Sequence, residues 1–227
     1  MEYIKTIVCF ANSRKISGRC IAGKEFLTGQ IGDWIRPVSA RPTHEISEDE
    51  RRYKDGRDPQ LLDILEIPCI IHQPLPHQNE NHLIDSRASW VQVGKLPWID
   101  LHRWTDSPQD LWGVGQCSYS GVNNRLAFGM ENSRSLYLLP VERLRLFVGK
   151  KAPKYPDSKR AIRGEFKYNG KIYRMDVTDP VIERNYLSHD DGTYEIVSPI
   201  LCISLGDPFE GFYYKLIAAI LFEDRCK

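Results

Sequence analysis

Lysine, arginine, asparagine and serine residues crowd the first forty positions, between short apolar runs. From residue 1 to residue 41 the chain carries seven lysines and arginines against three carboxylates. Cations and hydrogen-bonding side chains on the loops of a small β-structure are typical of surfaces that contact phosphate and sugar. The residues that we expect to make such contacts are Asn12, Ser13, Arg14, Lys15, Arg19, Lys24, Arg36 and Ser39, with Trp34 as a ring for base stacking.

A second basic stretch runs from Val141 to Arg174, with eleven cations and three carboxylates, whereas Met175 to Lys227 has four cations and ten carboxylates. The net charge of +1 therefore conceals an uneven distribution. Aromatic residues are interleaved with the cations, so charges that follow phosphates and rings that stack on bases occur together. The expected nucleic-acid contacts in this stretch are Lys167, Tyr168, Lys171 and Tyr173.

Both basic stretches also have a structural explanation. A solvated, flexible loop explains the second stretch as well as a binding surface does. In the first stretch, Arg14 and Arg36 also suit ion pairs that tie two domains together through carboxylates.

Two groupings contain residue types that hydrolases use. Cys117, with His189 far downstream, suits a thiol hydrolase, but its neighbours match neither cysteine-protease signature. His189, Asp190 and Asp191 suit a metal-dependent hydrolase, whereas the three histidines of the 72–82 loop recur at a spacing unlike that of metal ligands. We therefore expect a binding module in preference to an enzyme, with no catalytic residue, metal or cofactor. A hydrolase near Cys117 and His189 is the alternative.

A third interpretation is an interaction scaffold whose acidic C-terminal half docks a partner protein. It predicts an exposed apolar patch and no salt-sensitive DNA binding.

The composition is that of a soluble globular protein, with 41% hydrophobic and 27% charged residues. Six cysteines are scattered without a C-x-x-C pair, the first residues lack a basic leader region, and no run of eighteen apolar residues exists. We expect reduced thiols, a cytoplasmic location and no membrane contact.

Short apolar segments separated by turn residues predict a mainly β protein. In the first half we expect strands near residues 4–10, 19–26, 34–38, 61–71 and 90–94, a helical turn over 48–53 capped by Ser47, and a long loop over 112–129. The apolar run Leu136 to Pro140 closes one unit, and the alternating run Val141 to Val148 opens another. We therefore place a domain boundary near Pro140, which gives domains 1–140 and 141–227.

The second half has clearer local signals. Asn169-Gly170 predicts a β-hairpin turn between residues 165 and 176, after a linker over 149–164. Asp179 and Pro180 predict the N-cap and first turn of a short helix. Strands over 196–205 and 213–222 complete a five-stranded Greek-key barrel of the oligonucleotide/oligosaccharide-binding (OB) type. The first half has a comparable strand count, so we expect two OB-like barrels with short helices and long loops.

Five segments of the chain resemble the bacterial dual OB domain-containing proteins. They read A-N-S-R-K-x-x-G-R-C-x-A-G-K-E at 11–25, W-I-R-P-V-S at 34–39, V-T-D at 177–179, S-L-G-D-P-F at 204–209 and Y-K-L-I-A-A-I at 214–220. The resemblance implies two OB-like barrels and a nucleic-acid-binding role beside bacterial defence or repair systems. It supplies no catalytic residues.

Overall fold

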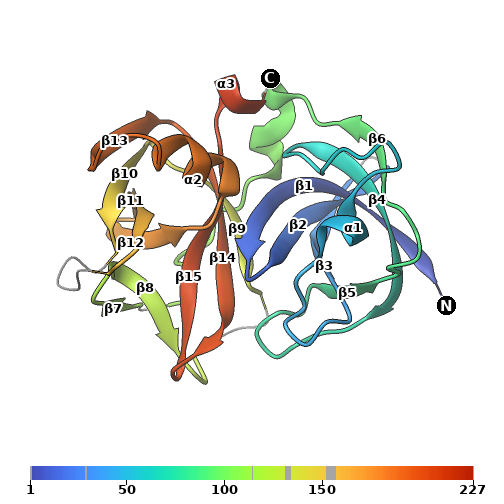
Figure 1. Cartoon of the computed structure of the whole chain (residues 1–227), viewed down its shortest axis with the longest axis horizontal. Coiled ribbons are helices and arrows are strands. Elements are labelled where there is room, and N and C mark those ends of the chain that lie inside the picture. The colour runs from blue at the N-terminus through green and yellow to red at the C-terminus, as the bar shows by residue number, and fades with distance from the viewer. Residues whose placement is uncertain (1, 29, 114, 131–133, 152–156, 227) are drawn as a thin grey trace. The chain divides into compact units, whose positions relative to one another are not determined.

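The structure, a computed structural model, describes residues 2–28, 30–113, 115–130, 134–151 and 157–226. It is mainly β, as the sequence predicts, with short helices between strands (Figure 1). Two compact units form: Met1–Trp104 together with Glu223–Lys227, and Thr105–Phe222. The division falls at Trp104 and not near Pro140, because the strands just before Pro140 pair within the second unit.

The first unit is a curled six-stranded sheet. Its elements are β1 (Tyr3–Lys15), β2 (Gly18–Leu27), β3 (Gln30–Val38), α1 (Glu48–Arg51), β4 (Asp63–His72), β5 (Asn81–Ile84), β6 (Val91–Lys95), η1 (Trp98–Trp104) and the C-terminal α3 (Glu223–Cys226). The strand order is β1-β2-β3-β5-β4-β6, and β1 also pairs with β4. The sheet therefore closes on itself, with β3 and β5 parallel, in the strand order of an OB barrel.

Alternating side chains fill the interior of this barrel. Ile7 and Cys9 of β1, Ile21 of β2, Leu65 of β4 and the ring of Trp90 are all fully buried in one core. Outside the core, the predicted cap of α1 is confirmed. Ser47 and Glu50 form a capping box, in which each side chain bonds the other residue's backbone N–H.

The second unit contains β7 (Gln116–Ser118), β8 (Gly121–Ala127), β9 (Leu136–Pro140), β10 (Arg143–Lys150), β11 (Arg160–Tyr168), β12 (Lys171–Val177), α2 (Pro180–Tyr186), β13 (Gly192–Val197), β14 (Ile200–Phe209) and β15 (Phe212–Leu221). Its sheet has the order β13-β10-β11-β12-β8-β15-β14-β9, and β12 also pairs in parallel with β15. Strands β10 to β13 and β15 thus repeat the OB order. Within the described residues β13 pairs with β10 alone, so this second barrel is open.

Two local predictions in this unit are confirmed and two are wrong. Asn169 and Gly170 both have positive φ, 45° and 79°, at the β11–β12 turn. Asp179 caps α2, and its other carboxylate oxygen accepts the Ile220 N–H of β15. The expected linker 149–164 instead contains the end of β10 and the beginning of β11, which pair with each other. The expected loop 112–129 instead contains β7 and β8, which also pair with each other.

Candidate nucleic-acid interface

The tip of the β1–β2 hairpin gathers three cations. Arg14 is the cross-strand partner of Arg19, and Lys15 pairs with Gly18 at the turn. Arg14 is exposed, while Lys15 and Arg19 are half-buried. All three residues also take part in further interactions within the protein.

The tip of the hairpin is held in place by the segment around Ile46. The backbone N–H and C=O of Arg19 both bond to Ile46, each at 2.9 Å, and the Ser17 hydroxyl donates to Glu45. A hydrogen bond from Thr43 lowers the pKa of Glu45, which keeps this acceptor ionised. Gly18 is required here, because a Cβ at its position would lie 2.5 Å from the Ile46 carbonyl oxygen. The cations therefore project from a fixed support.

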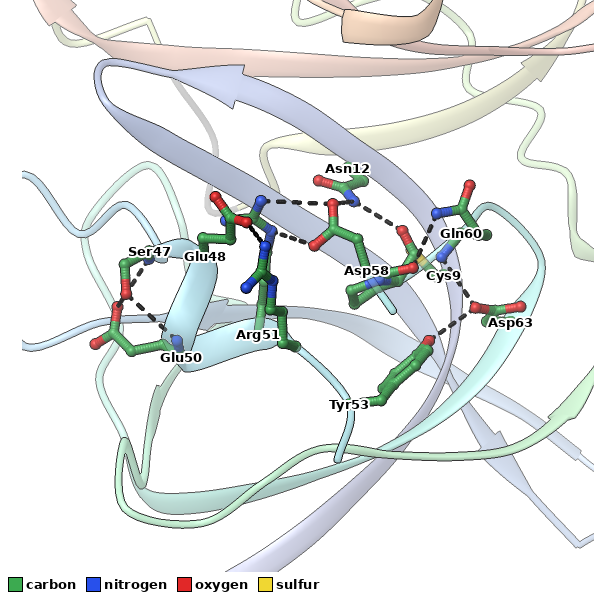
Figure 2. A network of polar contacts seen from close by, with 12 residues as sticks. Cys9, Asn12, Ser47, Glu48, Glu50, Arg51, Tyr53, Asp58, Gln60 and Asp63 are labelled. Carbon is green, nitrogen blue, oxygen red and sulfur yellow. Dashed lines mark hydrogen bonds and ion pairs between the residues drawn. The ribbon is translucent and has the colours of Figure 1, made fainter. Parts of the chain in front are cut away.

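Asn12, which the sequence assigned to the same contacts, belongs to a polar network of the first unit (Figure 2). Ser39, from the same predicted set, bonds to Glu50 of this network. The Asn12 amide donates to the Pro59 carbonyl at 2.8 Å and to Asp58, the carboxylate that also pairs with Arg51 at 2.6 Å. The buried Ser39 hydroxyl donates to Glu50 at 2.7 Å. These bonds attach α1 and the loop after it to the barrel.

Four further residues from the sequence-based set are buried in the first unit. Ser13 donates to the Cys20 carbonyl. The ammonium of Lys24 donates to the Trp104 carbonyl at 2.6 Å and lies 5.4 Å from the centre of the Trp34 ring, which is itself only 5% exposed. Arg36 pairs with Glu80 at 3.3 Å, and both side chains are 5% exposed. Their contacts stabilise the first unit, and their buried side chains are not accessible to a ligand.

The outer face of β10, β11 and β12 carries the second group of cations. Strand β10 alternates, so Leu144 and Leu146 enter the core while Arg143 and Arg145 point outward. The strand registers then align Arg145, Glu165 and Arg174 in one row.

Glu165 holds this row together. Its carboxylate is buried, with 7% of the side chain exposed, and accepts hydrogen bonds from both Arg145 and Arg174. Arg174 also lies 4.6 Å from the centre of the Phe147 ring. On β13, Glu195 lies opposite Arg145 in the register and pairs with Arg143 at 3.0 Å, so carboxylates and guanidinium groups alternate along the row.

A cleft of about 340 Å³ opens on the same face. Its lining combines three cations, two carboxylates and two apolar side chains: Glu142, Arg143, Arg145, Glu165, Phe166, Lys167 and Ile172. Lys167 and Ile172 are exposed, and among the described residues the Lys167 side chain makes no ion pair or hydrogen bond. The cleft thus offers charge beside apolar surface, which suits a phosphate joined to a base or sugar.

Neither tyrosine of the second set is fully exposed. Tyr173 is 1% exposed and stacks on Phe166 in the core, with ring centres 5.6 Å apart. Tyr168 is half-buried, and its hydroxyl donates to the Pro108 carbonyl at 2.7 Å. Lys171 remains exposed at the hairpin turn. The basic stretch also includes residues 152–156, which lie outside the described residues.

A family comparison agrees with this architecture. The model of the dual OB-containing domain matches residues 5–220. The chain belongs to the dual OB domain family. A crystal structure titled as the tetrameric p202 HIN2 also matches 97% of this chain and 93% of its own, at 9% identity and a TM-score of 0.31. That likeness is too low to carry an argument, and no protein with a curated description matches the chain.

In this dual OB chain, the hydrolase alternative gains no support from the geometry. Cys117 is exposed on β7, and among the described residues it makes no hydrogen bond to a histidine. Asp191 pairs with Arg160, while the His189 ring contacts Tyr186 and Tyr194. No group of three potential metal ligands occurs in the part of the chain that the structure describes.

The sequence analysis missed Arg143, Arg145 and Arg174 as members of the dual OB chain's basic face. The signal was present in the alternation from Val141 to Val148, which places both β10 arginines on one side of a strand.

None of the helices among the described residues is long and apolar enough to cross a membrane.

Proposed function

We propose that this dual OB protein is a nucleic-acid-binding module that holds a single-stranded ligand. In the first unit Arg14, Lys15 and Arg19 contact phosphates. In the second unit the face of β10 to β12, with Arg143, Lys167 and Lys171 at its accessible positions, contacts the same class of ligand. A cytoplasmic accessory role beside a bacterial defence or repair system belongs to this proposal.

The observation that carries the proposal is the placement of Arg14 opposite Arg19 on the hairpin that joins the first two strands of an OB barrel. In OB modules, the loop between strands 1 and 2 and the face of strands 2 and 3 receive oligonucleotides. Cations at this loop are placed where they can contact the phosphates of such a ligand.

Fluorescence anisotropy with a labelled single-stranded oligonucleotide tests the proposal. We expect Arg14→Ala to weaken binding several-fold. The matched control is Arg87→Ala in the same unit, because Arg87 is an exposed arginine, with 76% of its side chain accessible, that lies outside the β1–β2 hairpin. Equal affinity of the two variants, or no binding by the wild type, contradicts the proposal.

A second candidate function, a protein-interaction scaffold, is favoured by apolar side chains around the β14–β15 turn. Phe209 is 61% exposed and Phe128 is 51% exposed. The two lie near each other, because the Phe128 N–H bonds to the Gly211 carbonyl and Phe209 pairs with Phe212. A Phe128→Ser, Phe209→Ser variant that binds oligonucleotides normally but loses a cellular partner supports this function; full retention of partners rejects it.

A further inference from the structure

Ile16 occupies the tip of the β1–β2 hairpin in an unusual conformation. Lys15 and Gly18 are the last paired residues, so Ile16 and Ser17 form the turn. Ile16 has a φ of 47° and is 67% exposed. It is the one β-branched residue with positive φ among those that the structure describes. Such residues strongly avoid this region, and outliers of this kind concentrate at functional sites.

Neither local folding nor packing explains isoleucine at this position. A glycine or asparagine would form the turn without strain. The exposed side chain buries little apolar surface within the protein. Lys15 precedes Ile16, Arg14 is one residue further along β1, and Ser17 follows Ile16. An apolar tip next to two cations matches a ligand in which apolar surfaces alternate with anionic groups.

We propose that Ile16 is a wedge that inserts between neighbouring bases of the bound nucleic acid while Arg14 and Lys15 hold the flanking phosphates. This inference rests on the proposed function and adds a specific role for the hairpin tip. Apolar side chains inserted at a base step separate the stacked bases and hold them apart. The contacts of Arg19 and Ser17 with Ile46 and Glu45 hold the tip in position before the ligand arrives.

A single-stranded oligonucleotide that carries 2-aminopurine between two adenines tests the wedge, because its fluorescence rises when stacking is lost. We expect the wild type to increase this fluorescence on binding. Ile16→Gly should bind more weakly by several-fold, keep the same salt dependence and lose most of the fluorescence rise. The matched control is Ile4→Ala, at the other end of β1, where Ile4 is 61% exposed. This control should behave as the wild type.

Thermal unfolding separates loss of the wedge from loss of the fold. Since glycine relieves the positive φ, Ile16→Gly should unfold at a temperature no lower than the wild type. If Ile16→Gly raises the fluorescence as the wild type does, the wedge is rejected, and the proposed function survives provided that Arg14→Ala still weakens binding. If the wild type binds no oligonucleotide, both the wedge and the proposed function are rejected.

Discussion

Arg14 on β1 lies directly opposite Arg19 on β2, at the hairpin turn that we propose contacts the ligand. Replacing Arg14 with threonine removes one cation and places a good strand former at the position. We expect the free energy of unfolding to stay within about 1 kcal/mol of the wild-type value, while oligonucleotide affinity falls. Urea denaturation and anisotropy on the same preparation measure the two effects. A parallel loss of both quantities would show that Arg14 is a structural residue.

Glu165 pairs with two arginines on the basic face of the second unit. Its replacement should therefore lower the stability of the protein and raise its affinity for oligonucleotides. Glu165→Gln keeps the shape but leaves Arg145 and Arg174 without their shared carboxylate. We expect a stability loss of about 1–3 kcal/mol, because a buried charge-assisted network is broken. Oligonucleotide affinity should increase, since the face gains one positive charge. Reduced affinity in a folded Glu165→Gln protein would argue against phosphate contact at this face.

The buried pair Arg36–Glu80 should matter for folding and not for binding. Arg36→Met leaves the Glu80 carboxylate without its cation in a site where both side chains are 5% exposed. Breaking such a pair costs about 3–5 kcal/mol. The double variant Arg36→Met, Glu80→Leu should recover much of this loss, because no unpaired charge remains buried. The salt dependence of binding by the double variant should equal that of the wild type; a shallower dependence would place Arg36 in the interface.

Lys215 of β15 should make the stability of the second unit depend on alkaline pH. The residue is 1% exposed, and its ammonium lies 5.5 Å from the centre of the Tyr173 ring. Burial lowers the pKa of Lys215 to about 8 from an ordinary value of 10.5. Between these two values the unfolded chain binds the additional proton, so the free energy of unfolding should rise as pH increases from about 8 to 10.5. The rise attributable to this group is at most about 3 kcal/mol.

Comparison with Lys215→Met isolates this effect from other groups that titrate in the same range. Methionine fills the space without a charge, so the variant should be more stable than the wild type at pH 7, and the difference should shrink toward pH 10.5. Urea denaturation at several pH values measures it. A constant difference across the series would mean that Lys215 keeps its ordinary pKa.

The sequence predicted the elements whose geometry is local. Ser47 with Glu50, Asp179 with Pro180 and Asn169 with Gly170 each determine a cap or a turn through neighbouring backbone groups, and all three form as expected. The boundary near Pro140 was wrong because membership of a unit depends on long-range pairing. Strand β9 ends at Pro140 but pairs with β14, some sixty residues later in the chain.

Candidate site residues were harder to predict, because residue type does not show which face of a strand a side chain occupies. Four residues have side chains suited to nucleic-acid contacts but are buried against partners from elsewhere in the protein: Lys24, Trp34, Arg36 and Tyr173. Arg14 and Lys167 have the same chemistry on exposed positions. The difference arises from strand register and from covering segments such as η1, whose Trp104 ring stacks on Phe26.

The salt dependence of wild-type binding to a single-stranded oligonucleotide tests the central claim most directly. Each phosphate contact contributes roughly 0.7 to the slope of log affinity against log salt concentration. Contacts from Arg14, Lys15 and Arg19 alone therefore predict a slope of about −2 or steeper, and replacing all three by alanine should remove about that amount. Affinity that does not change with salt, or a slope that the triple variant leaves intact, would contradict the account.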